Sequence, residues 1–392
     1  MKKTLVLVVA FAFALTCLLG FSPAMAREEG AADLAEGQVA EDVQAVNEKA
    51  GLETPTMETP DEFIKRFDHV EYVPASDFNL TDEQVAKIQE ANLTAGLVLH
   101  TSGESYSAAL VAGIEKAAEE LNVEIIAQTN CNWKAEQQAI DLENVLSMNP
   151  DIVIMMQVDV SAMRQQVKDA QANGVQMVFV DNIADGLEQG EYTSLVTSDT
   201  YGNGVECGRV MAQELNGEGK VAMFSWSAPN IGNRARSQGF RDYIETNFPD
   251  IEIVTEELFN DATECTQLAE AVFAKYPDLD GAFGQWDIPA EGINSAAQSS
   301  GIGDDFVIVC VDLGYNVARI MAEGGKVKGI GAQQPYNCGI EQLRVGALGA
   351  IGEETPDMIL LDSVAVTYEN LTDAWPIIYD EPLPDDVAAL MG

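Results

Sequence analysis

The chain has 392 residues, 47% of them hydrophobic, which is enough for two globular domains with substantial cores. Its 64 Asp and Glu residues outnumber 21 Lys and Arg, giving a formal net charge of −43. An acidic surface of this kind repels phosphate backbones and anionic lipids, so composition argues against nucleic acid as a partner.

Residues 1–26 have the pattern of a secretory signal peptide. Lys2 and Lys3 precede an apolar stretch over residues 5–20, and Ala24-Met25-Ala26 forms a small-x-small cleavage site. The apolar stretch is short for a membrane span. The pattern therefore predicts a protein of the periplasm or another extracytoplasmic compartment.

Two segments separate this signal from the first predicted domain. Residues 27–60 are acidic and poor in aromatic residues, so we expect a flexible acidic leader. Residues 61–92 are more apolar and are expected to form an N-terminal extension with a helix. Thr81 followed by Gln84 has the capping-box pattern that begins such a helix.

From residue 93 onward, apolar strands alternate with amphipathic helices. Strands are predicted at residues 95–101, 123–129, 151–157 and 175–181, with helices after residue 105 and at 134–146 and 161–172. Near-continuous apolar strands between amphipathic helices are typical of a parallel sheet covered on both faces.

The rhythm breaks around residues 193–201, and a second set of elements follows. Its strands are predicted at residues 220–226, 251–256, 281–286, 306–312 and 328–333, and its helices at 233–247, 263–276, 290–299, 315–323 and 339–351. We therefore predict an α/β protein with two similar doubly wound lobes, a multi-strand hinge and a ligand cleft between them. Lobe 1 is assigned residues 93–197 and 335–363. Lobe 2, with a C-terminal extension, is assigned residues 198–334 and 364–392.

The reactive residues are few and widely separated. Beyond the signal lie five cysteines, none in a Cys-x-x-Cys pair, which argues against zinc and against a disulfide framework but leaves one disulfide open. The only histidines are His69 and His100, and we expect His100 to be a buried strand residue. No strand is followed by Gly-x-Gly-x-x-Gly, so a dinucleotide site is unsupported. We expect no cofactor and no bound metal.

Several short motifs together resemble the periplasmic sugar-binding proteins of ABC transporters, most closely the ribose-binding type. They are MVFVDN at 177–182, RARSQGF at 234–240, FGQWD at 283–287, IVCVD at 308–312 and AQQP at 332–335. The resemblance spans about residues 93–370. It implies a type I periplasmic binding fold and no enzymatic activity.

The resemblance also implies a set of ligand-binding residues. Carried over position by position, it gives Glu104, Tyr106, Asp181, Asn182, Arg234, Trp286, Asp312 and Gln333. Trp286 stands where the family commonly has Asn, and the first loop has Tyr106-Ser107 where two adjacent aromatics are frequent. These departures bear on which sugar is bound.

The residue types suit a polyhydroxylated ligand. Carboxylates and amides pair with hydroxyls, Arg donates through a rigid fork, and aromatic rings cover apolar faces. Purely structural roles are the alternatives for these residues. Asp181 and Asp312 follow strands and are also candidates for helix capping, and Gln333 for tying backbone at the hinge.

The aromatic and acidic candidates have alternatives as well. Trp286, Trp133, Trp226 and Tyr106 all follow strands and are also candidates for core or rim packing. Glu104 is either an exposed loop charge or a cleft residue; in the cleft it disfavours acidic ligands and allows an amino or cationic group.

The residues and the resemblance lead to one functional prediction. We expect a monomeric extracytoplasmic protein that captures a small sugar or polyol and delivers it to an ABC transporter permease. A protein that senses such a solute for a chemoreceptor or sensor kinase is an alternative of the same class. A secreted α/β hydrolase is the alternative of another class, against which stands the absence of a Gly-x-Ser-x-Gly elbow.

Overall fold

A computed structural model describes residues 38–60, 63, 72–228 and 230–392. The predicted signal peptide lies outside this part. Within it, no helix is long and apolar enough to cross a membrane.

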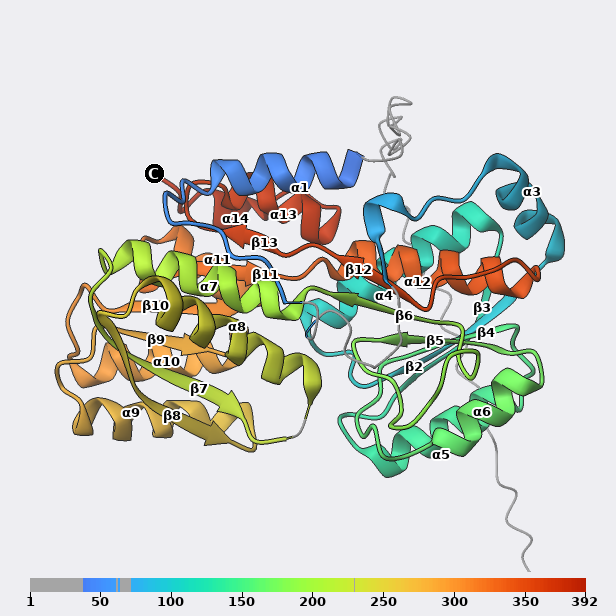
Figure 1. Cartoon of the computed structure of the whole chain (residues 1–392), viewed down its shortest axis with the longest axis horizontal. Coiled ribbons are helices and arrows are strands. Elements are labelled where there is room, and N and C mark those ends of the chain that lie inside the picture. The colour runs from blue at the N-terminus through green and yellow to red at the C-terminus, as the bar shows by residue number, and fades with distance from the viewer. Residues whose placement is uncertain (1–37, 61–62, 64–71, 229) are drawn as a thin grey trace, which may run out of the picture. The chain divides into compact units, whose positions relative to one another are not determined.

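The described chain contains two sheets (Figure 1). In spatial order, the first sheet consists of β1 (Tyr72–Pro74), β12 (Met358–Leu361), β6 (Ser194–Ser198), β5 (Gln176–Val180), β4 (Ile152–Met155), β2 (Thr94–Leu99) and β3 (Glu124–Asn130). The second consists of β13 (Val364–Val366), β11 (Val327–Ala332), β10 (Val307–Val311), β9 (Gly281–Gly284), β7 (Gly219–Trp226) and β8 (Ile251–Phe259). All neighbouring strands are parallel except β11 and β13, which pair antiparallel. The prediction of two α/β lobes is thus confirmed, with one antiparallel edge pair where parallel pairing was expected.

Helices cover both faces of each sheet. With the first sheet lie α3 (Asp82–Ala91), α4 (Ser105–Leu121), α5 (Ala135–Leu146), α6 (Arg164–Ala172) and α12 (Pro335–Ala350), and η1 (Ala75–Asp77) follows β1. With the second lie α7 (Thr200–Glu214), α8 (Ile231–Asn247), η2 (Ala262–Glu264), α9 (Cys265–Lys275), α10 (Asp287–Ser300), α11 (Tyr315–Ala322), α13 (Leu371–Tyr379) and α14 (Asp385–Ala388). The capping box predicted at Thr81 is confirmed, since Thr81 and Gln84 satisfy each other's backbone N–H groups.

The apolar strands are buried on both faces because each strand supplies two cores. In β10, the alternate residues Val307, Val309 and Val311 enter the core under α7 and α8. Ile308 and Cys310, between them, enter the core under α9, α10 and α11. A period of two with no polar member is what a central parallel strand requires.

Each lobe holds its cleft-facing helix through a close helix crossing. A Cβ on Gly204 of α7 would lie 2.0 Å from the carbonyl oxygen of Arg236 in α8, and Gly239 has the same relation to Tyr201. In the other lobe, a Cβ on Gly113 of α4 would lie 1.9 Å from the Tyr336 carbonyl oxygen of α12. Only glycine permits backbones this close. The crossings therefore set the positions of α4 and α8, whose first turns carry candidate site residues.

The chain passes between the sheets after β6, after β11 and between β12 and β13. Residues near two of these crossings bind the segment before β1. Asn47 donates to the Ser363 carbonyl and accepts from the Ala365 N–H, and the Thr59 hydroxyl donates to Asp199 at 2.5 Å. The hinge region is thus overlaid by the N-terminal segment.

The expectation of a flexible leader over residues 27–60 is wrong for the described residues 38–60. Residues Gln38–Lys49 form α1, which lies beside α13 and β13 (Figure 1). Val43 and Val46 are 3% and 5% exposed in the core of the second lobe. Further on, Pro55 accepts a hydrogen bond from the Tyr243 hydroxyl. The expectation failed because it rested on the acidic composition of the segment and overlooked the apolar residues on one face of α1.

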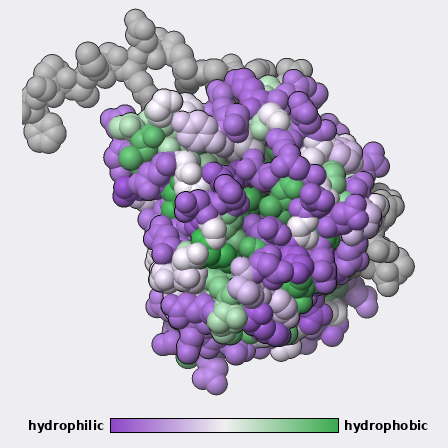
Figure 2. Space-filling model, turned by 90° about the vertical axis from the view of Figure 1, so that its left-hand side faces the viewer, coloured by the Kyte–Doolittle hydropathy of each residue, from purple (hydrophilic) through white to green (hydrophobic). Residues whose placement is uncertain are grey.

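The face of the molecule drawn in Figure 2 is largely hydrophilic. Hydrophilic side chains cover most of the face in Figure 2, with hydrophobic ones gathered near its centre.

All five cysteines of the described chain are buried and free, so no disulfide links the lobes.

Candidate functional site

A cavity of about 770 Å³ is lined by residues from both lobes. Its lining includes every predicted site residue except Arg234: Glu104, Tyr106, Asp181, Asn182, Trp286, Asp312 and Gln333. These side chains come from loops and helix starts at the carboxyl ends of the strands, where parallel α/β sheets place ligands.

Asp181 and Asp312 occupy matching positions in the two lobes. Each directly follows a buried strand, β5 or β10, and each has a left-handed backbone with φ of 56° and 69°. Asp tolerates this conformation better than most residues. The alternative of helix capping is not observed, because Gly314 caps α11 and no helix begins within the three residues after Asp181.

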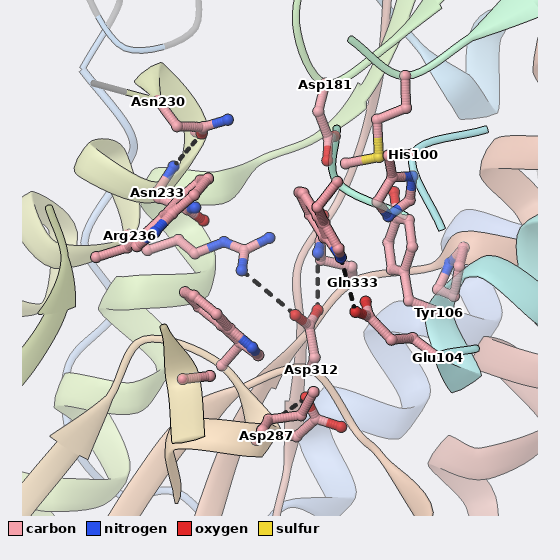
Figure 3. Close-up of a pocket in the computed structure, with 18 of the residues that line it drawn as sticks. His100, Glu104, Tyr106, Asp181, Asn230, Asn233, Arg236, Asp287, Asp312 and Gln333 are labelled. Carbon is pink, nitrogen blue, oxygen red and sulfur yellow. Dashed lines mark hydrogen bonds and ion pairs between the residues drawn. The ribbon is translucent and has the colours of Figure 1, made fainter. Parts of the chain in front are cut away.

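Asp312 is the centre of a polar network (Figure 3). One carboxylate oxygen accepts a hydrogen bond from Gln333 Nε2 at 2.7 Å, and the other pairs with Arg236 Nη1 at 3.3 Å. The Arg236 side chain is 7% exposed and that of Asp312 is 19% exposed. Because little water reaches this ion pair, removing either partner would leave the other as a poorly hydrated, unpaired charge.

The arginine prediction needs correction. Arg234 is exposed and does not line the cavity, whereas Arg236 is buried and does. Two residues along a helix turn the side chain by about 200°, so the two arginines point to opposite faces. The sequence did carry a signal, since Gly232 and Phe240, four residues either side of Arg236, form the buried face of α8.

On the other lobe, Asp181 accepts a hydrogen bond from the Thr197 hydroxyl at 2.9 Å. Asn182 is 3% exposed and its Oδ1 has no partner among the described residues. Gln333 Oε1 is likewise buried without one. Buried polar atoms are normally satisfied, so these two acceptors favour a ligand that donates hydrogen bonds.

Aromatic side chains form one wall of the cavity. Trp226 stands edge-to-face with both Trp133 and Trp286, with ring centroids 6.1 Å apart in each pair. Trp286 is half-buried and also packs against Phe259, so it belongs to the core and the cavity at once. Trp133 is 45% exposed at the cavity.

Burial shifts the pKa of several lining residues, among them Asp287, Glu104 and His100. It raises the pKa of Asp287 to about 8, with the nearby charge of Asp312 as a further cause. It also raises the pKa of Glu104, against the opposing effect of the hydrogen bond from Trp133. Burial lowers the pKa of His100 to about 4, so this imidazole is neutral at physiological pH.

Sequence reasoning missed Asp287, Asn230 and Asn233 as well as Arg236, although all four line the cavity. Asp287 follows Trp286 directly in the FGQWD motif, and its carboxylate fills the space left by Gly314, where a Cβ would lie 1.9 Å from Oδ2. Among the residues that the structure describes, no group of three or more His, Cys, Asp or Glu side chains is arranged to hold a metal ion.

Two α/β lobes around a cavity with polar and aromatic walls define a solute-binding protein. The chain belongs to the family of periplasmic binding protein domains, which it matches over residues 95–354. This confirms the resemblance to sugar-binding proteins of the ribose-binding type.

Known proteins and structures give the same picture. The chain is 28% identical to the ribose import binding protein of Bacillus subtilis over 243 residues, covering 62% of this chain and 76% of that one. Its fold is similar to that of an ABC transporter solute-binding protein of Agrobacterium vitis bound to α-D-tagatopyranose. The TM-score is 0.67 and the identity 24%, and the match covers 74% of this chain and 100% of that one. It is also similar to one of Bacillus halodurans with bound myo-inositol, with a TM-score of 0.65, 23% identity and coverage of 72% and 97%. These relatives are solute-binding proteins and not enzymes, which confirms the expectation of no enzymatic activity and removes the hydrolase alternative.

Proposed function

We propose that this protein captures a small sugar or polyol outside the cytoplasm and delivers it to an ABC transporter permease. The observation that carries the proposal is Asp312, held between Arg236 and Gln333 in a cavity that both lobes line. Carboxylate, guanidinium and amide groups so placed can accept from and donate to several hydroxyls at once.

The ligand-binding roles rest on the same geometry. Asp181 and Asn182 face the ligand from the first lobe, and Arg236, Asp312 and Gln333 face it from the second lobe and the hinge. Trp286 and Tyr106 cover its apolar faces. The names of the relatives support this class of ligand: one is a ribose import binding protein, and two are ABC transporter solute-binding proteins bound to α-D-tagatopyranose and myo-inositol.

A thermal-shift screen against pentoses, hexoses, polyols and amino sugars tests the capture step. A ligand at a hundred times its Kd stabilises the native state by about 2.7 kcal/mol, which raises the Tm measurably. Each hit is then titrated by calorimetry. If no sugar or polyol raises the Tm, the proposed ligand class is wrong.

Delivery is tested by uptake. Cells that lack this protein should lose uptake of the radiolabelled hit at low concentration, and the wild-type chain should restore it. Normal uptake without the protein would contradict the transport role and favour a sensing one.

A further inference from the structure

The cavity is unusually rich in negative charge. Six carboxylates line it: Glu104, Asp159, Asp181, Asp261, Asp287 and Asp312. Among its described lining residues, Arg236 is the single Lys or Arg, and His100 is neutral. Asp159 and Asp261 are exposed, but the other four are at least half-buried, so water screens them less.

Three of these carboxylates lie close enough to influence one another across the cleft. Glu104 is the N-cap residue before α4, Asp287 lies in the first turn of α10, and Asp312 directly follows β10 (Figure 3). The charge of Asp312 raises the pKa of both others, and that of Glu104 raises the pKa of Asp287. Keeping all three ionised around a neutral ligand therefore has an electrostatic cost, which favours a proton on one of them.

The cation of the second lobe does not relieve this cost for all three. Arg236 and Gln333 occupy the two oxygens of Asp312. Glu104 accepts from Trp133 Nε1 at 3.2 Å and Asp287 from the backbone N–H of Ile288 at 2.9 Å. Neither is ion-paired within the described part of the chain.

A second observation is that polar atoms beside Asp312 are buried without a hydrogen-bond partner among the described residues. The Asp312 carboxylate can only accept, so Gln333 must turn its Nε2 toward it, which leaves Oε1 as a buried acceptor. Gln333 is 2% exposed and Oε1 has no partner among the described residues. On the opposite side Arg236 Nε is a buried donor without a partner, which suits a ligand hydroxyl.

The aromatic wall adds affinity for a cation. Trp133, Trp226 and Trp286 stand in an edge-to-face series beside Glu104 and Asp287. Indole faces attract ammonium groups, and more strongly where water is excluded. A neutral sugar would use these rings only for apolar contact.

We propose that the ligand is a sugar or polyol carrying a protonated amino group, bound between Glu104 and Asp287 beside the tryptophans. This rests on the proposed function and specifies its ligand. The hydroxyls of the ligand bind Arg236, Asp312 and Gln333. The ammonium group of the ligand is the cationic partner of Glu104 and Asp287, neither of which is ion-paired within the described part of the chain.

Ammonium binding is coupled to a proton. Asp287 faces Asp312, Glu104 and Glu291, together with the phenol of Tyr379, and in the free protein it holds a proton at neutral pH. A neighbouring ammonium group favours its ionised form. Binding of an amino ligand at pH 7 therefore releases a proton, whereas binding of a neutral sugar does not.

The test is calorimetric titration with matched trios: glucose, glucosamine and N-acetylglucosamine; the same three forms of galactose; and sorbitol, 1-amino-1-deoxysorbitol and its N-acetyl form. At pH 6.5 we expect the amino member of at least one trio to bind about tenfold or more tighter than both neutral members. At pH 7, its apparent enthalpy should change with the ionisation enthalpy of the buffer in proportion to the released proton.

Charge-removing variants locate the effect. Glu104→Gln and Asp287→Asn should each lower the ratio of amino-member affinity to neutral-member affinity toward one, whatever the change in absolute affinity. Asp305→Asn removes one exposed negative charge outside the cavity and should keep the preference, which controls for net charge. Melting curves show whether each variant is folded.

Each other outcome overturns the inference. If a neutral sugar, in these trios or in the wider screen, binds as tightly as any amino ligand, the inference fails and the proposed function stands. Binding that requires added CaCl2 and ignores the amino group also overturns it. If no sugar, polyol or amino derivative binds, the inference and the proposed function both fail.

Discussion

Arg236 offers the sharpest test of the site, because Arg234 on the same helix is a matched control. Arg236→Met keeps an unbranched apolar stem, shorter than that of Arg, and removes the charge and the donors. The change removes the ion pair with Asp312 and the donors available to a ligand hydroxyl. A hydrogen bond to a charged group contributes about 1.5–3 kcal/mol, so affinity should fall about 10- to 150-fold.

The change should also cost stability. Asp312 would face Asp287 and Glu104 without its cation, while Gln333 continues to donate to it. Loss of one partner of a buried pair costs about 3–5 kcal/mol, and the partial exposure of Asp312 favours the lower end. The Tm should therefore fall, but the protein should still unfold cooperatively.

Titration calorimetry with the hit from the screen, beside a calorimetric melting curve, measures both effects. Arg234→Met should leave affinity and Tm at wild-type values, since the side chain is exposed and outside the cavity. Wild-type affinity in Arg236→Met, or a loss confined to Arg234→Met, would refute the assignment.

Three further predictions concern other parts of the molecule. Val46→Ala should lower the free energy of unfolding by about 1–2 kcal/mol in denaturant titrations, because Val46 is 5% exposed, whereas Gln44→Ala on the exposed side of α1 should not; equal effects would mean that α1 does not pack as described. Gly314→Ala should weaken ligand binding in calorimetry, because the new Cβ would lie 1.9 Å from Oδ2 of Asp287 and would displace this carboxylate. Unchanged affinity would show that the carboxylate is not needed. Stability of the free protein should fall as pH rises from 6.5 to 8, because folded Asp287, with a pKa of about 8, holds a proton that the unfolded chain has lost. Glu341, with a pKa of about 7, adds to this slope. His100 opposes it in part near pH 6.5, where the unfolded imidazole still binds protons that the folded one, with a pKa of about 4, does not. Asp287→Asn should flatten this profile of Tm against pH, and an unchanged slope would contradict the described burial of Asp287.

The strand pattern was sufficient to predict the two sheets, because buried parallel strands leave an unbroken apolar run. Residues 307–311 illustrate this, since each is apolar and each is buried. The same reasoning placed Asp181 and Asp312 at strand ends. Their shared left-handed backbone, which turns both carboxylates into the cavity, depends on tertiary context and could not be predicted.

The errors came from reading composition or a motif before helical periodicity. Val39, Val43, Val46 and Ala50 recur at helical spacing, yet the surrounding acidic residues suggested a flexible leader. RARSQGF offered two arginines, and only the positions of the apolar residues around them distinguish the buried one. Asp287 gave no separate signal, because its neighbours Glu104 and Asp312 are brought to it by the fold.

The hydrogen bonds of Asn47 have a consequence for the order of folding. Asn47 binds Ser363, 316 residues later in the chain, and the Val46 carbonyl accepts from the fully buried Asn370. Synthesis begins at the N-terminus, so α1 is made first and its docking surface almost last. Closing so long a loop is entropically costly. The apolar face of α1 therefore waits without a partner through most of synthesis, and its docking is a late step that completes the second lobe.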